Sequence, residues 1–429
     1  TSRLEKYYNR FLPISVSTEN IIVLHLVYGI LNNSLYLEYP LDAESISSLN
    51  NCYARHNTDI NILSFLNPES PIPDLLFQAN LRKIVIEEKM IKFLKKMELS
   101  QVEHLEILKL NKGKKPIYFS MSSKLKLSYE YLLEMNNLET LILKKVRLSK
   151  RCVKILPDLE IKRLELDQSF LYPEKILRAI SQLSTLTSLR LNFDTPAKEV
   201  GPYFKGIFEN NNIRILEISF DSCIDINSFA LENLKELEEL TLNFVDFEFE
   251  SIKNINSLTK LCVLNGKEYR KKEIQDMDFK IETLSLSGTS FNSSLISSLS
   301  SSFPNLVSLD LSHSKYKCEE LPSRITSLNI SNSQVNYQFF DKTVRQLVML
   351  ETLSALSISP MALRYDIYEK LPLDNLTHLE LDTIKYADTD YLSDVSMQLP
   401  EDDITELDNK YSYVLRKFYK VWSITHIIS

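Results

Sequence analysis

The sequence predicts an α/β fold: a solenoid with short parallel strands on its concave face and with helices and 3₁₀ turns on its convex face. Three observations predict it, namely a recurring apolar motif, a nearly regular distance between its copies, and helix-like spacing of apolar residues between them. The chain has 429 residues, of which 44% are hydrophobic and 25% charged, so it can bury a sizeable core.

The recurring motif is LxxLxL, in which Ile or Val can take the place of Leu. The copies start roughly 19–33 residues apart, which is the spacing of leucine-rich repeats. Two weaker copies begin at Leu81 and Leu350. Because each repeat leaves an apolar edge that only its neighbour covers, the motif predicts a stack of ~13 repeats over residues 81–385. The clear copies begin at Leu105, Leu138, Ile161, Leu186, Ile213, Leu237, Leu258, Ile281, Leu306, Ile325 and Leu376.

The last two apolar residues of each motif are two positions apart, so on a strand they point to the same side and enter the core. The residue between them then points to the concave face, which solenoids commonly use to bind proteins. We therefore predict a mixed polar surface on that face. Its members are Lys109, Glu165, Arg190, Glu217, Thr241, Ser285, Asp310, Asn329 and Glu380.

The segments that follow the strands carry their own signals. Residues 176–183 place apolar side chains at helical spacing, and Pro173 suits the first turn of that helix. Many leucine-rich repeats carry Asn or Cys three residues after the last strand leucine. Here Thr289, Ser314 and Ser333 stand at that position, and we expect their hydroxyls to hydrogen-bond a buried loop amide.

Composition and motifs argue against several classes of protein. Only 6 Gly residues are present, which disfavours phosphate-binding loops, and a net charge of −7 disfavours nucleic acid as a partner. The 5 Cys and 6 His residues are scattered and form neither a metal-ligand nor a nucleophile motif. The longest apolar run, around residues 21–31, is too short to span a bilayer. We therefore expect no enzyme activity, no cofactor, no metal and no membrane association.

The two ends of the chain depart from the repeat. Residues 1–80 carry no LxxLxL motif, and we predict a helical region there. Residues 386–408 are acidic and predict a linker. Residues 409–429 return to helical spacing and predict the start of a further helical segment.

The first residues place apolar side chains on one face of a helix, at Leu4, Tyr8, Phe11 and Leu12. This segment resembles the BC box of the Zyg-eleven/Zer family, the leucine-rich-repeat substrate receptors of elongin–cullin-2 ubiquitin ligases. A BC box presents Leu, then Cys four residues later, then an apolar residue after four more. Leu4, Tyr8 and Leu12 fit that register, with Tyr8 in place of Cys and Arg3 in place of a small residue. The resemblance implies that Leu4, Tyr8, Phe11 and Leu12 bind elongin C.

A second segment is similar to the cullin box of the same family, in which an apolar residue and Pro begin a helix. Here Tyr39 and Pro40 would begin it, and Ile46 and Leu49 follow on its apolar face. The resemblance implies that these four residues bind cullin-2. An alternative start at Pro13, preceded by Leu12, stays open.

The end of the chain is similar to the helix that opens the family's armadillo-like domain, over residues 410–412 and 422–426. The sequence lacks most of that domain, so the resemblance does not imply the family's recognition of N-terminal glycine degrons. The resemblance implies a non-catalytic substrate receptor in the cytoplasm, the nucleus or both. Its partners would be elongin B/C, cullin-2 and an unknown protein substrate.

Two other interpretations remain open. One is an F-box-type receptor that uses the Skp adaptor in place of elongin. The other is a generic intracellular leucine-rich-repeat scaffold in which residues 1–80 form a helical cap.

Overall fold

The chain folds into two compact units, residues 1–221 and 222–429. The computed structural model describes residues 34–37, 62–65, 81–108, 129–146, 148–167, 173–193, 201–210, 212–225, 230–246, 248–266, 274, 277–289, 293–314, 321–333, 339, 343–355 and 378–381.

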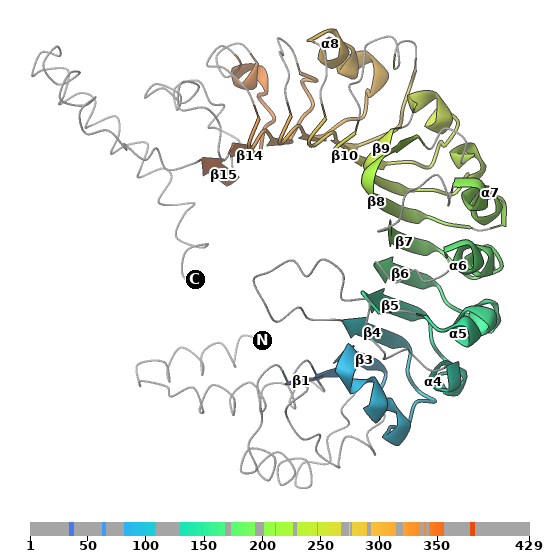
Figure 1. Cartoon of the computed structure of the whole chain (residues 1–429). Helices are drawn as coiled ribbons and strands as arrows, with labels where there is room; N and C mark the ends of the chain where they lie inside the picture. The colour runs from blue at the N-terminus through green and yellow to red at the C-terminus, as the bar shows by residue number, and fades with distance from the viewer. Residues whose placement is uncertain are drawn as a thin grey trace, which may run out of the picture. The chain divides into compact units, whose positions relative to one another are not determined.

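The first unit is built on a ladder of parallel strands that follow one another in chain order (Figure 1). Each strand is short, because a repeat contributes only a few residues to the ladder before the chain turns away to the helical side. The strands are β1 (Ser34–Leu37), β2 (Ile62–Phe65), β3 (Lys83–Glu87), β4 (His104–Leu108), β5 (Thr140–Lys144), β6 (Arg163–Asp167), β7 (Ser188–Phe193) and β8 (Ile215–Asp225), whose residues after Asp221 belong to the second unit.

The second unit repeats this arrangement, again with parallel strands in chain order. From β11 to β13 each strand has only three residues. The strands are β9 (Glu239–Asp246), β10 (Lys260–Leu264), β11 (Thr283–Ser285), β12 (Ser308–Asp310), β13 (Ser327–Asn329), β14 (Thr352–Ala355) and β15 (His378–Leu381).

The motif leucines are in register from strand to strand and form the core. In the first unit Leu105, Leu141, Leu164, Leu189 and Leu216 are direct neighbours across the ladder, and each is at most 1% exposed. The same register holds in the second unit. Its members are Leu240, Leu261, Leu284, Leu309 and Leu328. The predicted α/β leucine-rich-repeat solenoid is therefore confirmed.

Helices and 3₁₀ turns connect the strands and lie on one side of the ladder. In Figure 1, helices α4 to α7 lie on the same side of strands β4 to β7. The other side, which we call the open face, carries the side chains that flank the buried leucines along each strand. The connecting elements are η2 (Glu88–Lys96), α4 (Tyr129–Glu134), α5 (Lys150–Ile155), η3 (Leu156–Asp158), α6 (Pro173–Ile180), α7 (Gly201–Asn210), η6 (Leu231–Asn233), η7 (Phe249–Ile252), α8 (Ser293–Ser302) and η9 (Val344–Gln346).

Local sequence explains where two of these helices begin. Helix α6 begins at Pro173 as predicted, because proline at the first helical position loses no helix hydrogen bond. Helix α5 follows Ser149, whose Oγ accepts a hydrogen bond from the amide of Cys152 at 3.2 Å. The apolar stripe of α6 packs inward, since Ile176, Leu177 and Ile180 are fully buried.

The prediction of the first clear motif was wrong by three residues. Leu105 is paired with Ile84 in β3 and with Leu141 in β5, so it is the second apolar residue of its repeat. The repeat is therefore Val102-xx-Leu105-x-Ile107, and all three residues are fully buried. The segment contains two overlapping motif frames, and only the register of the neighbouring strands selects between them. The open-face position of this repeat belongs to Glu106, while Lys109 lies outside the described residues.

The prediction of a helical region over residues 1–80 was wrong at two places. Strands β1 and β2 extend the parallel ladder ahead of β3, with Leu35 beside Leu63 and Leu63 beside Ile84. The motif search missed them because Phe65 stands in place of the last leucine of β2 and a polar residue, Asn32, stands in place of the first leucine of β1.

Candidate functional site

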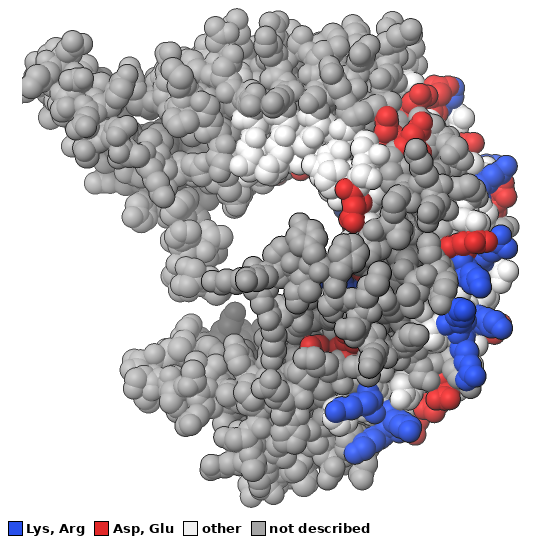
Figure 2. All heavy atoms as spheres, viewed as in Figure 1, with Lys and Arg blue, Asp and Glu red and all other residues white. Residues whose placement is uncertain are grey.

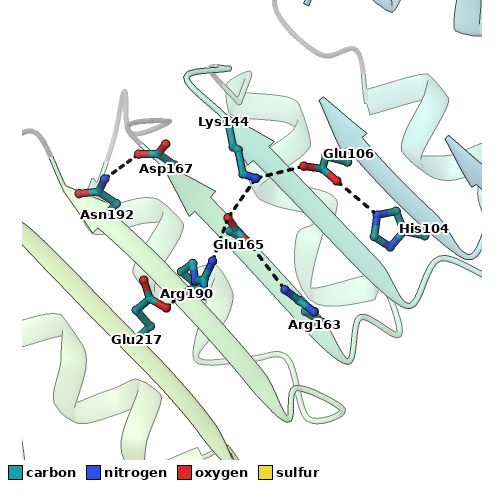
Figure 3. A network of polar contacts seen from close by, with 9 residues as sticks. All are labelled: His104, Glu106, Lys144, Arg163, Glu165, Asp167, Arg190, Asn192 and Glu217. Atoms are coloured by element: carbon teal, nitrogen blue, oxygen red, sulfur yellow. Dashed lines mark hydrogen bonds and ion pairs between the residues drawn. The ribbon is translucent and has the colours of Figure 1, made fainter. Parts of the chain in front are cut away.

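The open face of the first unit carries a network of paired charges on neighbouring strands (Figure 3). Each charged residue of the network flanks a buried leucine or isoleucine of its own strand, so all of the charges are presented on the same face. We call this set the charged network. Its members are Glu106, Lys144, Arg163, Glu165, Arg190 and Glu217.

Glu165 is the centre of the charged network. Its side chain is only 6% exposed, and three cations surround its carboxylate. Lys144 Nζ lies 3.7 Å and Arg190 Nη1 3.6 Å from Oε1, and Arg163 Nη2 lies 3.7 Å from Oε2. A buried carboxylate is costly unless cations or hydrogen bonds compensate it. The three strands β5, β6 and β7 each supply one of these cations.

Lys144 joins Glu165 to a second carboxylate on β4. Its Nζ lies 3.1 Å from Oε1 of Glu106, and His104 Nε2 lies 3.8 Å from Oε2 of the same group. The His104 imidazole and the Lys144 ammonium together lower the pKa of Glu106 to about 2, against the opposing effect of burial. Glu106 is therefore fully ionised at neutral pH.

Arg190 extends the charged network toward β8. Its Nε lies 2.6 Å from Oε2 of Glu217, while its Nη1 faces Glu165. Arg190 stands directly between Glu165 and Glu217 in the ladder, so one guanidinium serves two carboxylates. Beside it, Asn192 Nδ2 donates to Asp167 Oδ1 at 2.7 Å. The result is a surface whose charges are balanced and whose side chains hold one another in place.

The open face of β11 to β14, in the second unit, is held instead mainly by hydroxyl groups. Hydroxyl pairs link neighbouring repeats, with Ser287 Oγ 2.9 Å from Ser312 Oγ and Ser331 Oγ 3.0 Å from Ser354 Oγ. Ser285 Oγ donates to Oδ2 of Asp310 at 3.0 Å. In Figure 2 the surface where these strands run is mostly white, which marks uncharged residues. We call this part of the open face the hydroxyl ladder. Its members are Ser285, Ser287, Asp310, Ser312, Asn329, Ser331 and Ser354.

The predicted hydroxyls after the strands are buried, but they bond a different group. Thr289 Oγ1 donates to the carbonyl of Leu286, and Ser333 Oγ donates to the carbonyl of Ile330. Ser314 Oγ donates to the carbonyl of Leu286 at 3.0 Å. The expected acceptance from a loop amide is therefore wrong, and these hydroxyls act as donors to buried loop carbonyls.

The structure brings together most of the predicted open-face residues that it describes. Glu165, Arg190 and Glu217 are direct neighbours in the first unit. A second run of predicted residues lies in the second unit and consists of Thr241, Ser285, Asp310 and Asn329, with Cys262, which was not predicted, between the first two. Sequence reasoning missed the charges at the strand ends, such as Lys144 and Arg163. Alternation with a period of two, extended by one step in both directions, would have found them.

The residues predicted to bind elongin and the cullin lie outside the described residues. They are Leu4, Tyr8, Phe11 and Leu12 for elongin, and Tyr39, Pro40, Ile46 and Leu49 for the cullin. In the part of the chain that the structure describes, no group of three or more His, Cys, Asp or Glu side chains is placed to hold a metal ion. Within the same part, no helix combines the length and apolar character needed to cross a membrane.

The fold and its open face define a leucine-rich-repeat protein. No protein-family model and no curated protein sequence matches the chain. Among solved structures it is similar to an internalin, InlF, of Listeria monocytogenes, with 13% identity, a TM-score of 0.39, and 81% of this chain and 92% of that chain covered. It is also similar to a leucine-rich-repeat protein of Leptospira interrogans, with 18% identity and a TM-score of 0.39. That match covers 80% of this chain and 81% of the Leptospira chain. A third similarity is to the complex of Rad7 and Elc1 in yeast, with 12% identity and a TM-score of 0.41. That match covers 88% of this chain and 96% of the chain in the complex.

Proposed function

We propose that this chain is a non-catalytic scaffold that binds other proteins through its open face. One observation carries the proposal. Because the motif leucines are buried in register, the polar side chains between them form continuous rows, held at the ~4.8 Å spacing of the strands. Such an extended and fixed surface suits a protein partner better than a small molecule, which needs an enclosing pocket.

We further propose that the scaffold is the substrate-recognition subunit of a cullin-RING ubiquitin ligase that contains elongin B/C and cullin-2. The sequence supports this through the BC-box-like segment and the cullin-box-like segment that follows it. The first would place Leu4 and Leu12 in a groove of elongin C, as an amphipathic helix binds a hydrophobic groove. Pro40 would begin the helix that contacts the cullin.

In this role the chain contributes binding and distance and leaves the chemistry to other subunits. The BC-box-like and cullin-box-like segments would attach the solenoid to the ligase, and the open face would hold the substrate protein. Ubiquitin transfer is then favoured because the substrate lysine is kept near the activated ubiquitin, which raises its effective concentration. No residue of this chain has to accept a proton or form a covalent bond.

Co-purification with elongin B/C tests the ligase proposal. We expect the wild-type chain to retain elongin B/C and Leu4→Asp to lose it, because the aspartate would have to enter an apolar groove. Asn9→Asp is the matched control, since it adds the same charge to the same segment at a position outside the BC-box register. Retention of elongin B/C by Leu4→Asp would reject the assignment.

A parallel experiment with the Skp adaptor separates the alternative receptor. Capture of Skp without elongin would establish the F-box-type interpretation. Capture of neither adaptor would leave the chain as a generic leucine-rich-repeat scaffold.

A further inference from the structure

Asp310 stands in the middle of the hydroxyl ladder with both carboxylate oxygens fixed. In the ladder it lies between Ser285 of β11 and Asn329 of β13. Its Oδ2 accepts a hydrogen bond from Ser285 Oγ at 3.0 Å, and its Oδ1 accepts one from the amide of Ser312 at 2.9 Å. The residue remains partly exposed. Each oxygen keeps a lone pair for a further donor.

The fold does not require the negative charge of Asp310. In the next repeat, Asn329 occupies the same position, and its Oδ1 accepts the amide of Ser331 at 3.1 Å. In both repeats the serine that donates its amide also takes part in a hydroxyl pair, Ser312 with Ser287 and Ser331 with Ser354. A neutral amide can therefore accept the same hydrogen bond in the turn. The negative charge of Asp310 is not needed for the turn and can serve to bind a cation.

The carboxylate of Asp310 also differs from those of the charged network in the partners that surround it. There, Glu106, Glu165 and Glu217 each lie within 4 Å of a Lys or Arg side chain. Among the residues that the structure describes, no Lys, Arg or His side chain lies within 4.0 Å of the Asp310 carboxylate. A cation that balances Asp310 would have to come from outside this part of the chain.

We propose that the open face of β11 to β14 docks an extended segment of a partner protein that places one Lys or Arg side chain on Asp310. This inference rests on the proposed scaffold function and names the partner's chemistry. The carboxylate is already oriented, so a guanidinium or ammonium gains a charge-assisted hydrogen bond at little ordering cost. The surrounding surface consists of Ser308, Ser327, Thr352 and similar uncharged residues, which suit neutral polar neighbours in the docked segment.

Selection of peptides on the full chain tests the proposal. The probe is a phage-displayed library of random peptides panned on the immobilised wild-type chain. We expect the selected peptides to carry one Lys or Arg among uncharged polar residues. The affinity of a synthetic selected peptide is then measured by fluorescence anisotropy.

Three variants make the affinity measurement specific. Asp310→Asn should weaken the peptide roughly tenfold or more, because a charge-assisted hydrogen bond is lost while the turn acceptor stays. Replacing the basic residue of the peptide by Gln should weaken binding to the wild-type chain as much, and should change little further on Asp310→Asn. Glu282→Gln, which neutralises an exposed carboxylate in the turn before β11, is the matched control and should stay within about twofold.

The outcomes separate the docking site from the scaffold function. Equal affinity for Asp310→Asn and the wild-type chain, or selected peptides without a basic residue, would overturn the docking site and leave the scaffold standing. Failure to enrich any peptide over beads without the chain would overturn both. Unchanged thermal unfolding of Asp310→Asn shows that a loss of affinity is not a loss of fold.

Discussion

The charged network of the first unit and the hydroxyl ladder of the second occupy the same positions of the same repeat. In the first unit, three carboxylates share three cations, and every ion pair except that of Arg163 with Glu165 joins adjacent strands. In the second unit, hydroxyl pairs link the strands, and the carboxylate of Asp310 is bound only by neutral donors among the described residues. The motif leucines keep the same register in both units, although β11 to β13 are shorter than β4 to β7, so the contrast between the two faces lies mainly in side-chain chemistry.

This difference shows that a repeat fold leaves its open face free to vary. The buried leucines determine where the open-face side chains stand, and they are equally buried in both units. In the charged network each charged side chain is paired with another member of the network. These ion pairs restrain the side chains, and their strength depends on pH and salt. The hydroxyl ladder depends on hydrogen bonds from neutral donors and contains no ion pair among its members, so its stability should vary less with salt.

The largest expected effect tests whether the two cores are equivalent. Leu164→Ala in β6 and Leu309→Ala in β12 should each lower the free energy of unfolding by about 2–5 kcal/mol, because each leaves a cavity in a closely packed core. Urea unfolding measures both variants. A loss in one unit more than twice that in the other would show that the cores differ, and the comparison of open faces would then lose its common basis.

The sequence predicted the core leucines wherever the apolar motif is regular. It misplaced or missed the strands whose motif is irregular. The leucines of β5 to β14 were predicted because their apolar pattern repeats without interruption. The repeat at Leu105 was misplaced because two overlapping frames are equally apolar, and only pairing with Ile84 and Leu141 resolves them. The strand at Leu63 was missed because Phe65 fills the place of a leucine with a larger apolar side chain.

The second prediction concerns Gly288 of the second unit. Gly288 has φ of +71°, and a Cβ there would collide with Oδ1 of Asn265. Gly288→Ala should therefore lower the free energy of unfolding by about 1–3 kcal/mol. Gly206 in α7 is the control, because a Cβ there would meet Ser181 Cβ at an ordinary 3.9 Å. Gly206→Ala should be neutral or stabilise by up to ~1 kcal/mol. Equal effects of the two substitutions in urea unfolding would contradict this.

The sequence predicted which face of the sheet carries the residues of the candidate site. It did not predict which of their side chains form ion pairs. Alternation along a strand placed Glu165 and Arg190 on one face, and the structure confirms it. The pairing of Lys144 with both Glu106 and Glu165 depends on side chains from β4, β5 and β6 that lie up to 59 residues apart in sequence. No local pattern contains that information, because the ladder register has to be known first.

The third prediction contrasts the two open faces directly. Glu165→Gln should lower the free energy of unfolding by about 1–2 kcal/mol, because three cations lose their shared partner, although their partial exposure lets water compensate them. The loss should shrink in 1 M salt, where charges are screened over ~3 Å. Asp310→Asn should stay within about 0.5 kcal/mol at either salt concentration. The contrast would be refuted by a loss for Asp310→Asn as large as that for Glu165→Gln.

The smallest expected effect is a pH dependence that belongs to the first unit. The pKa of Glu106 is lowered from 4.5 to about 2 in the folded chain, so the folded state favours the ionised carboxylate. The stabilisation is complete above pH 4.5 and is lost as the pH falls from 4.5 toward 2. Because the neighbouring Lys144 is half exposed and screened by water, we expect it to reach only about 1 kcal/mol. The difference in urea midpoint between the wild-type chain and Glu106→Gln should therefore narrow as the pH is lowered from 6 to 3.5.

Glu239→Gln in the second unit, which breaks one exposed pair with Lys260, is the matched control and should change the midpoint little at any pH. A difference for Glu106→Gln that stayed constant across this range would mean that His104 and Lys144 do not hold the carboxylate ionised, and that the two open faces respond alike to acid.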